Sequence, residues 1–273
     1  MSLAFDPHRR PLIGALADAM RLAKHKIEDL TFQTRIETHV FAGRPLNVTI
    51  SDRTAAEWYG VDCPRLRDFD LLAGRGLNAG GLVFDIGAHQ GVVAMMLAHE
   101  VGPTGRVIAI EATERNAEIA RRNAALNGIA NVEISHAAIA RVDGPVLFSQ
   151  KRNGSVALSA GAGVKSVEGV SIDTLSARHG FPSLVYLDVE GYEFEALKGA
   201  PRTLGSRASW FIETHGDAEL GKFGACNADV VAAFDASFDL YWSPDNATTD
   251  FAPLSRDMAL PSDRFFLVAI KKS

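Results

Sequence analysis

The chain has 273 residues, a length that suits one large domain or one domain with an extension. Hydrophobic residues make up 47% and charged residues 22%, so the composition supports an ordinary globular core and excludes a disordered chain. The formal net charge is -5, and the 28 basic residues are scattered along the sequence. Because nucleic-acid binding needs basic residues clustered on one face, we expect no nucleic-acid partner.

The two cysteines, Cys63 and Cys226, stand in unrelated contexts without metal-ligand spacing. Isolated cysteines are typical of a reducing compartment, so we expect a cytoplasmic protein. Near the N-terminus, an apolar run that follows two arginines is interrupted early by Asp18, which disfavours a signal peptide. Apolar residues instead recur at helical spacing over residues 8–30 and predict an amphipathic helix. No stretch is long and apolar enough to predict a membrane span.

Residues 1–75 are interpreted as an N-terminal extension that contains a strand over 46–50, and residues 76–273 as the main domain. In the main domain, apolar runs of strand length alternate with helical segments, which predicts a parallel sheet covered on both faces. Residues 145–172 interrupt this alternation and predict an inserted hairpin. The predicted strands are 82–86, 106–110, 132–134, 184–189, 209–213, 238–242 and 264–270, and the predicted helices are 92–99, 114–126, 193–199 and 227–234.

The first strand of the main domain runs into the loop Asp85-Ile86-Gly87-Ala88-His89-Gln90-Gly91, and Glu111 ends the second strand. Glycines let the backbone approach a ligand at the carboxyl edge of a sheet, and a strand-end acid can bind both ribose hydroxyls. His89 stands where a dinucleotide site needs its second glycine, and the Asp85 carboxylate would repel a pyrophosphate. That carboxylate suits the ammonium group of a methionine moiety. The loop therefore favours S-adenosylmethionine over NAD, with capping of the turn as the other interpretation of Asp85.

Acidic residues and a histidine follow two later strands. Asp188 and Glu190 point to the same side if the chain stays extended, so they could orient a substrate. Glu193 is interpreted as a cap, because the helix dipole favours acids at a helix N-terminus. Glu213 and His215 follow the next strand, and His215 is the candidate general base because imidazole titrates near neutrality. A structural hydrogen bond is the alternative for His215.

The same four side chains (Asp188, Glu190, Glu213 and His215) could chelate a divalent ion such as Mg²⁺ or Mn²⁺. No spacing in the sequence demands a metal, so none is predicted. Ahead of the main domain, Glu57-Trp58-Tyr59 could form an aromatic wall over the pocket or simply a packed helix end.

The segment Leu187-Asp188-Val189-Glu190-Gly191-Tyr192-Glu193, followed by Leu197-Lys198-Gly199-Ala200, resembles the FkbM-type family of class I S-adenosylmethionine-dependent methyltransferases. The loop and the strand before it (Val83 to Gly91), Glu111, Asn123, Asn127 and Ile172-Asp173-Thr174-Leu175 add to this resemblance, which covers residues 80–216. It implies an α/β, Rossmann-like class I methyltransferase fold. That fold has a mostly parallel seven-stranded sheet, helices on both faces and an antiparallel last strand.

The resemblance also implies transfer of a methyl group from S-adenosylmethionine to a hydroxyl of a small molecule or sugar, leaving S-adenosylhomocysteine. Asp188 and Glu190 would face the methyl group, and His215 or a carboxylate would take the proton during an in-line displacement. One departure is Tyr186, where family members often carry lysine. The residues that would contact the cofactor, carried over by position, are Asp85, Gly87, Ala88, His89, Gly91, Glu111 and Asp188, with the adenine near Ala137 and Ala138.

Three alternatives remain open from the sequence. An NAD(P)-dependent oxidoreductase is disfavoured by His89. A non-catalytic cofactor-binding or interaction module would keep the fold without the chemistry. A methyltransferase of nitrogen atoms or protein side chains would use the same cofactor loop. The sequence is also compatible with a homo-oligomer.

Overall fold

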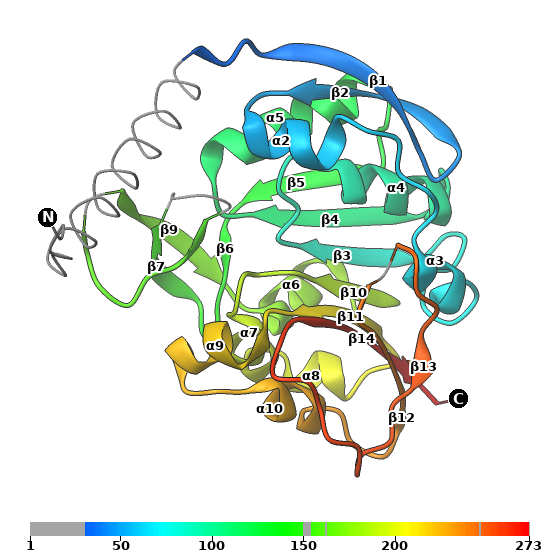
Figure 1. Cartoon of the computed structure of the whole chain (residues 1–273), viewed down its shortest axis with the longest axis vertical. Helices are drawn as coiled ribbons and strands as arrows, with labels where there is room; N and C mark the ends of the chain where they lie inside the picture. The colour runs from blue at the N-terminus through cyan, green and yellow to red at the C-terminus, as the bar shows by residue number, and fades with distance from the viewer. Residues whose placement is uncertain (1–30, 150–153, 162, 246, 273) are drawn as a thin grey trace, which may run out of the picture.

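An eight-stranded sheet forms the centre of the computed structural model, which describes residues 31–149, 154–161, 163–245 and 247–272. The strand order is β13-β12-β14-β11-β10-β3-β4-β5, and Figure 1 shows β5, β4, β3, β10, β11 and β14 following one another from top to bottom. The five strands from β5 to β11 are parallel, whereas β14 is antiparallel to both of its neighbours. The strands are β3 Leu82–Ile86, β4 Arg106–Glu111, β5 Val132–His136, β10 Leu184–Leu187, β11 Ser209–Thr214, β12 Phe238–Ser243, β13 Ala252–Pro253 and β14 Phe265–Lys271.

This topology confirms the predicted fold class. Seven strands form the expected mostly parallel sheet with a reversed last strand, and the two-residue β13 adds an eighth at the edge. The helix predicted for residues 8–30 lies outside the described residues. Within the described part of the chain, no helix has the length and hydropathy needed to cross a membrane.

Hydrophobic clusters cover both faces of the sheet because successive side chains of a strand point to opposite sides. Val83 belongs to the cluster beneath α4, and its neighbour Phe84 belongs to the cluster beneath α6, α7 and α10. Helix α5 packs on β4 and β5 beside α4. The helices of the main domain are α4 Val92–Val101, α5 Glu114–Leu126, α6 Ile172–His179, α7 Glu193–Lys198, α8 Pro201–Leu204, α9 Gly216–Leu220, the 3-10 turn η1 Gly221–Phe223 and α10 Asn227–Ala232.

The strand register brings the ends of the parallel strands to one edge. Ile86 at the end of β3 pairs with Ile110 of β4 on one side and with Leu187 of β10 on the other. Leu187 in turn pairs with Ile212 of β11. Consequently, the residues that follow these strands lie next to one another, where ligands bind in open α/β sheets.

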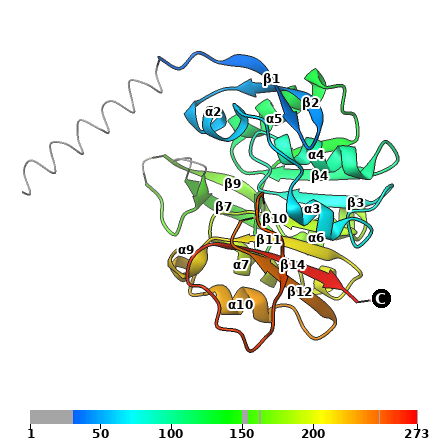
Figure 2. The same cartoon turned by 45° about the vertical axis from the view of Figure 1, so that its right-hand side comes forward.

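The segment predicted as a hairpin near 145–172 is a larger unit, a four-stranded sheet with the order β6-β9-β7-β8. It begins earlier than expected, directly after β5, and lies beside one end of the central sheet in Figures 1 and 2. Part of this segment forms strand β9, which pairs with β7 along the whole length of β7 although several of its residues are polar and exposed. The strands are β6 Ala138–Ile139, β7 Gly144–Ser149, β8 Ser155–Val156 and β9 Val164–Val170.

The described part of the N-terminal extension packs directly on the main domain. Its strands β1 (Arg35–Phe41) and β2 (Arg44–Ile50) form an antiparallel pair, followed by α2 (Arg53–Tyr59) and α3 (Arg67–Leu72). Two asparagines, Asn123 of α5 and Asn127 at its C-cap, connect β2 to α5 through hydrogen bonds. Asn123 Oδ1 accepts from the Thr49 backbone N–H at 2.9 Å, and Asn127 exchanges hydrogen bonds with the Asn47 backbone at 2.8 and 2.9 Å.

Candidate active site

The loop after β3 requires glycine at Gly87 and Gly91. Gly87 has φ +91°, and a Cβ there would lie 1.7 Å from the carbonyl oxygen of Asp188. Gly91 has φ +80°, and its Cβ would lie 2.8 Å from the Cβ of Ala120. Close approach of the loop to β10 and α5 therefore depends on the missing side chains.

Two buried carboxyl groups lie behind and beside this loop. Glu111 accepts the backbone N–H of His89 at 2.9 Å and that of Thr113 at 2.7 Å. Burial raises the pKa of Glu111 to about 7, against the effect of these hydrogen bonds. Asp85 is 3% exposed, and its Oδ2 has no hydrogen-bond partner among the described residues. Burial, and then the charge of Glu111, raise the pKa of Asp85 to about 7.

His89 joins the loop to aromatic residues of α2. Its φ of +48° is unusual for a residue with a side chain. Its Nδ1 lies 2.8 Å from the hydroxyl of Tyr59, and its ring centroid is 5.1 Å from that of Trp58. Burial lowers the pKa of His89 to about 4, so the ring is neutral at physiological pH. Trp58 is 45% exposed, so α2 contributes both a packed helix end and an aromatic wall at the site.

A cavity of about 610 Å³, measured with its open mouth, lies over the strand ends. Of the predicted site residues, those that line it are Gly87, His89, Glu111, Ala137, Ala138, Asp188 and Glu190. Asp85, Ala88 and Gly91 lie outside the lining, as do Glu213 and His215. Sequence reasoning missed the apolar lining from the small sheet, Phe148, Gly154 and Val156, because that sheet was expected only as a hairpin.

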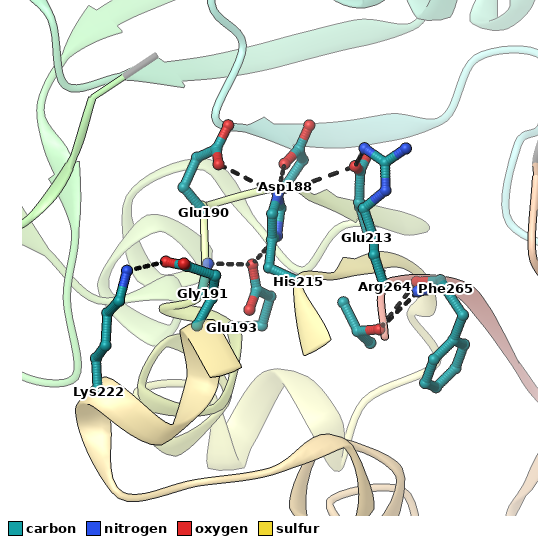
Figure 3. Close-up of polar contacts among 11 residues, drawn as sticks. Asp188, Glu190, Gly191, Glu193, Glu213, His215, Lys222, Arg264 and Phe265 are labelled. Atoms are coloured by element: carbon teal, nitrogen blue, oxygen red, sulfur yellow. Dashed lines mark hydrogen bonds and ion pairs between the residues drawn. The ribbon is translucent and has the colours of Figure 1, made fainter. Parts of the chain in front are cut away.

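The predicted catalytic residues gather around His215, as Figure 3 shows, and Asp188 and Glu190 among them line the cavity. Nε2 of His215 lies 3.4 Å from Glu190 Oε2, 3.6 Å from Asp188 Oδ1 and 3.9 Å from Glu213 Oε1. The positive φ values of Glu190 (+53°) and Gly191 (+93°) turn the chain sharply after β10. Arg264 binds Glu213 from the outer side at 2.7 Å.

Glu193, interpreted from sequence as a helix cap, has a further contact. Its Oε1 accepts the Gly191 backbone N–H at 2.9 Å, which agrees with a role at the start of α7. The same oxygen lies 2.8 Å from Nδ1 of His215. Only the tertiary structure brings α7 and the end of β11 together, so the sequence carried no signal for this pair.

A family model described as the methyltransferase FkbM domain matches residues 85–238, more than half of the chain. This FkbM match spans the loop after β3, Glu111 and the acidic cluster, which consists of the carboxylates of Asp188, Glu190 and Glu213 around His215. The chain belongs to the FkbM methyltransferase family. It is therefore an S-adenosylmethionine-dependent methyltransferase. A second family model, for protein-L-isoaspartate(D-aspartate) O-methyltransferase, matches residues 18–145.

Solved structures show more distant likeness to this FkbM methyltransferase. An FkbM methyltransferase from Methylobacillus flagellatus KT is 16% identical, with a TM-score of 0.44, 69% of this chain covered and 43% of that one. An rRNA methylase from Streptococcus thermophilus is 14% identical, with a TM-score of 0.45, and the covered shares are 76% and 95%. An S-adenosylmethionine-dependent O-methyltransferase from Thermotoga maritima is 13% identical, with a TM-score of 0.43 and shares of 87% and 78%. The comparison with curated proteins found no match.

Charge is concentrated in the acidic cluster of this FkbM enzyme. Burial alone would lower the pKa of His215, but the Glu193 hydrogen bond and the surrounding carboxylates outweigh it and raise the pKa to about 10. Burial and crowding with other carboxylates raise the pKa values of Asp188 and Glu213. His215 thus holds its proton at neutral pH, and the near-neutral titration expected of an ordinary imidazole does not apply to it.

Asp188, Glu213 and His215 each offer one atom suited to a metal ion, and these three atoms lie within 4.8 Å of one another. Carboxylates and a histidine can adopt this spacing around a divalent ion. The ring proton of His215 and the Arg264–Glu213 ion pair supply positive charge to the same group without an ion. The arrangement alone therefore assigns no metal.

Proposed function

We propose that this FkbM methyltransferase methylates a hydroxyl oxygen of a small molecule or sugar that carries no negative charge. The observation that carries the proposal is the position of Asp188 and Glu190, which line the cavity and are backed by Glu213 and His215. Carboxylates accept hydrogen bonds from hydroxyl groups and can receive a proton from them. A wall of this kind suits a hydroxylated acceptor.

The residues in and beside the cavity fit S-adenosylmethionine. The unpartnered, buried Oδ2 of Asp85 lies behind the loop and is suited to the cofactor's ammonium group. Glu111 would bind the ribose hydroxyls, and Ala137 and Ala138 would lie against the adenine in the apolar part of the cavity. When bound, S-adenosylmethionine supplies the methyl group, and its sulfur keeps the electron pair of the broken carbon–sulfur bond in S-adenosylhomocysteine.

Asp188 is the proton acceptor that the geometry favours. It lines the cavity with 39% of its side chain exposed, whereas the His215 side chain is 10% exposed, lies behind it and already carries a proton at neutral pH. As the new oxygen–carbon bond forms, the hydroxyl proton passes to the Asp188 carboxylate. Holding the hydroxyl against this wall supplies the orientation on which the reaction depends.

The negative charge of the carboxylates beside the cavity limits which acceptors can bind. Asp188, Glu190 and Glu213 surround a single imidazole, and such a group repels phosphates and other anions. This supports a neutral or cationic acceptor and argues against nucleic acid. The two cysteines are free thiols, and we propose a cytoplasmic location because free thiols persist in a reducing compartment.

The test follows S-adenosylhomocysteine release with matched acceptors: an uncharged polyol, an aminated polyol, a phosphorylated polyol, total RNA and total protein. We expect methylation of oxygen on an uncharged or aminated polyol. Asp188→Asn and His215→Ala should each lower turnover about 10²–10⁴-fold while S-adenosylhomocysteine binding changes little. The control is Glu195→Gln in the nearby helix α7, a residue that does not line the cavity, and its turnover should stay near that of the wild type.

Methylation of RNA, or of nitrogen atoms in protein, would contradict the proposal. A protein that binds S-adenosylhomocysteine yet methylates none of the hydroxylated acceptors would also contradict the proposed acceptor class.

A further inference from the structure

Glu193 is a fully buried carboxylate that does not line the cavity over the strand ends. Its side chain is 0% exposed, and its Oε2 has no hydrogen-bond partner among the described residues. Its Oε1 accepts two hydrogen bonds, from the Gly191 backbone N–H and from His215 Nδ1. Because a buried carboxylate is costly unless paired, this contact with His215 is a specific arrangement and not a surface accident.

The contact decides how the His215 ring is oriented. With Nδ1 held by Glu193 at 2.8 Å, Nε2 is the ring atom that faces Asp188 and Glu190 at 3.6 and 3.4 Å (Figure 3). The two ring nitrogens differ in role, and the partner of one sets what the other can do.

His215 is the positively charged group next to Asp188, because the other charged groups around the ring are carboxylates or are already paired. Carboxylates face the ring from the turn after β10 (Asp188 and Glu190), from β11 (Glu213) and from α7 (Glu193). Arg264, just before β14, is committed to Glu213 on the outer side and is 59% exposed. Among the described residues, the cation paired with Asp188 is His215.

We propose that Glu193 is a positioning residue, which holds the His215 ring with a protonated Nε2 toward Asp188, Glu190 and Glu213 as their shared counter-charge. The inference rests on the proposed function, because the counter-charge opposes the rise in the pKa of Asp188 that burial and the neighbouring carboxylates cause, and so favours the ionised form that can take the acceptor's proton. Glu193 itself touches neither cofactor nor acceptor. It acts through the histidine.

The test measures the ring nitrogens of His215 by ¹⁵N NMR in the free protein, with the signals assigned by their loss in His215→Gln. In the wild type, both nitrogens should stay protonated from pH 6 to 8.5. In Glu193→Gln, which keeps the shape but removes the charge, the ring should lose its proton at a pH at least about one unit lower. Glu195→Gln removes a neighbouring charge of α7 and should leave the ring unchanged.

Turnover gives the second measurement. With a hydroxylated acceptor, Glu193→Gln should lower kcat about 10–100-fold and change its pH profile, while the KM for S-adenosylmethionine stays the same. A merely structural Glu193 would change stability without moving the pH profile.

A neutral His215 ring in the wild type at pH 7 would overturn the inference, and this measurement needs no variant to fold. An unchanged ring in a folded Glu193→Gln would also overturn it, as would broadening of the His215 signals by equimolar Mn²⁺, since Nε2 would then be a metal ligand. None of these outcomes depends on the acceptor. Failure of the proposed O-methylation is therefore distinguishable from failure of this inference.

Discussion

Asp85 shows how one buried carboxyl group can link cofactor binding to pH. The group lies directly behind the cofactor loop with its Oδ2 unpartnered, and burial and the charge of Glu111 raise its pKa to about 7. Below that pH the group is neutral and offers little to an ammonium ion. Above it the carboxylate is charged, and a charge-assisted hydrogen bond contributes about 1.5–3 kcal/mol.

We therefore predict that S-adenosylhomocysteine binds about tenfold more tightly at pH 8 than at pH 6, as measured by calorimetric titration. Asp85→Asn should weaken binding at pH 8 about 10–100-fold and flatten the pH response. Asp239→Asn changes the net charge equally at an exposed position of strand β12 and serves as the control. If Asp85→Asn kept the full pH response, Glu111, whose pKa is also raised to about 7, would be the titrating group instead.

Individual residues also show where sequence reasoning reached its limit. The loop residues, Glu111 and the acids after β10 were identified because their residue types follow predicted strand ends. The Glu193–His215 contact was not, because a glutamate at a helix start already has a sufficient local explanation. The raised pKa of His215 likewise depends on the carboxylates of Glu193, Asp188 and Glu190, which lie 22 or more residues away in the sequence and which no local pattern displays.

At the scale of elements, the junction between the β3 loop and β10 is set by Gly87. A Cβ at this position would lie 1.7 Å from the Asp188 carbonyl oxygen, and the positive φ of +91° disfavours any side chain. Gly128, at the end of α5, also has a positive φ (+64°) but has open space around its Cβ position. Substitution at Gly128 therefore measures the free-energy cost of the positive φ alone, whereas substitution at Gly87 adds the cost of a steric clash.

We predict that Gly87→Ala lowers the free energy of unfolding by about 2–4 kcal/mol and abolishes S-adenosylhomocysteine binding, because the loop must move away from β10. Gly128→Ala should cost about 1 kcal/mol and leave binding intact. Urea unfolding and calorimetry measure both effects. Equal destabilisation by the two substitutions would show that the clash with β10 contributes nothing.

For the whole molecule, buried groups with raised pKa values, Asp85, Glu111 and His215 among them, make the folded state bind extra protons. The pKa values of Asp85 and Glu111 are raised from about 4 to about 7 in the folded protein. Between about pH 4 and pH 7 the folded state therefore binds more protons than the unfolded state, and the free energy of unfolding falls as pH rises through this range. The contribution of His215 is complete below its ordinary pKa of about 6.5 and is lost as pH rises toward 10. The effects of these three groups have the same sign, whereas the lowered pKa of His89, about 4, opposes them below about pH 6.5.

The cofactor-free protein should consequently be a few kcal/mol more stable near pH 6 than near pH 8.5, as measured by urea unfolding at both values. Asp85→Asn removes one of these groups and should reduce the difference. The carboxyl groups with lowered pKa values, such as Asp52, contribute stability above pH 4 and do not alter this range. Stability that rises from pH 6 to 8.5 would contradict the prediction.

The sequence by itself determined the α/β sheet, because buried parallel strands are short apolar runs separated by helices. The predicted strand over 82–86 and helix over 114–126 match β3 and α5. The sequence also predicted a cofactor site at the strand ends, because the glycines and acidic residues there can be recognised from their types and positions alone. Strands β1 and β9 were missed because their polar faces resemble loops, and only pairing with β2 and β7 makes them strands.

Only the tertiary structure decided which of the candidate residues act together. Register placed Asp188 beside Gly87, packing of α7 against the end of β11 joined Glu193 to His215, and the small sheet closed an apolar wall over the cavity. The physical reason is that charge and burial are sums over neighbours distant in sequence. The type of a residue is local, but its pKa and its partners belong to the fold.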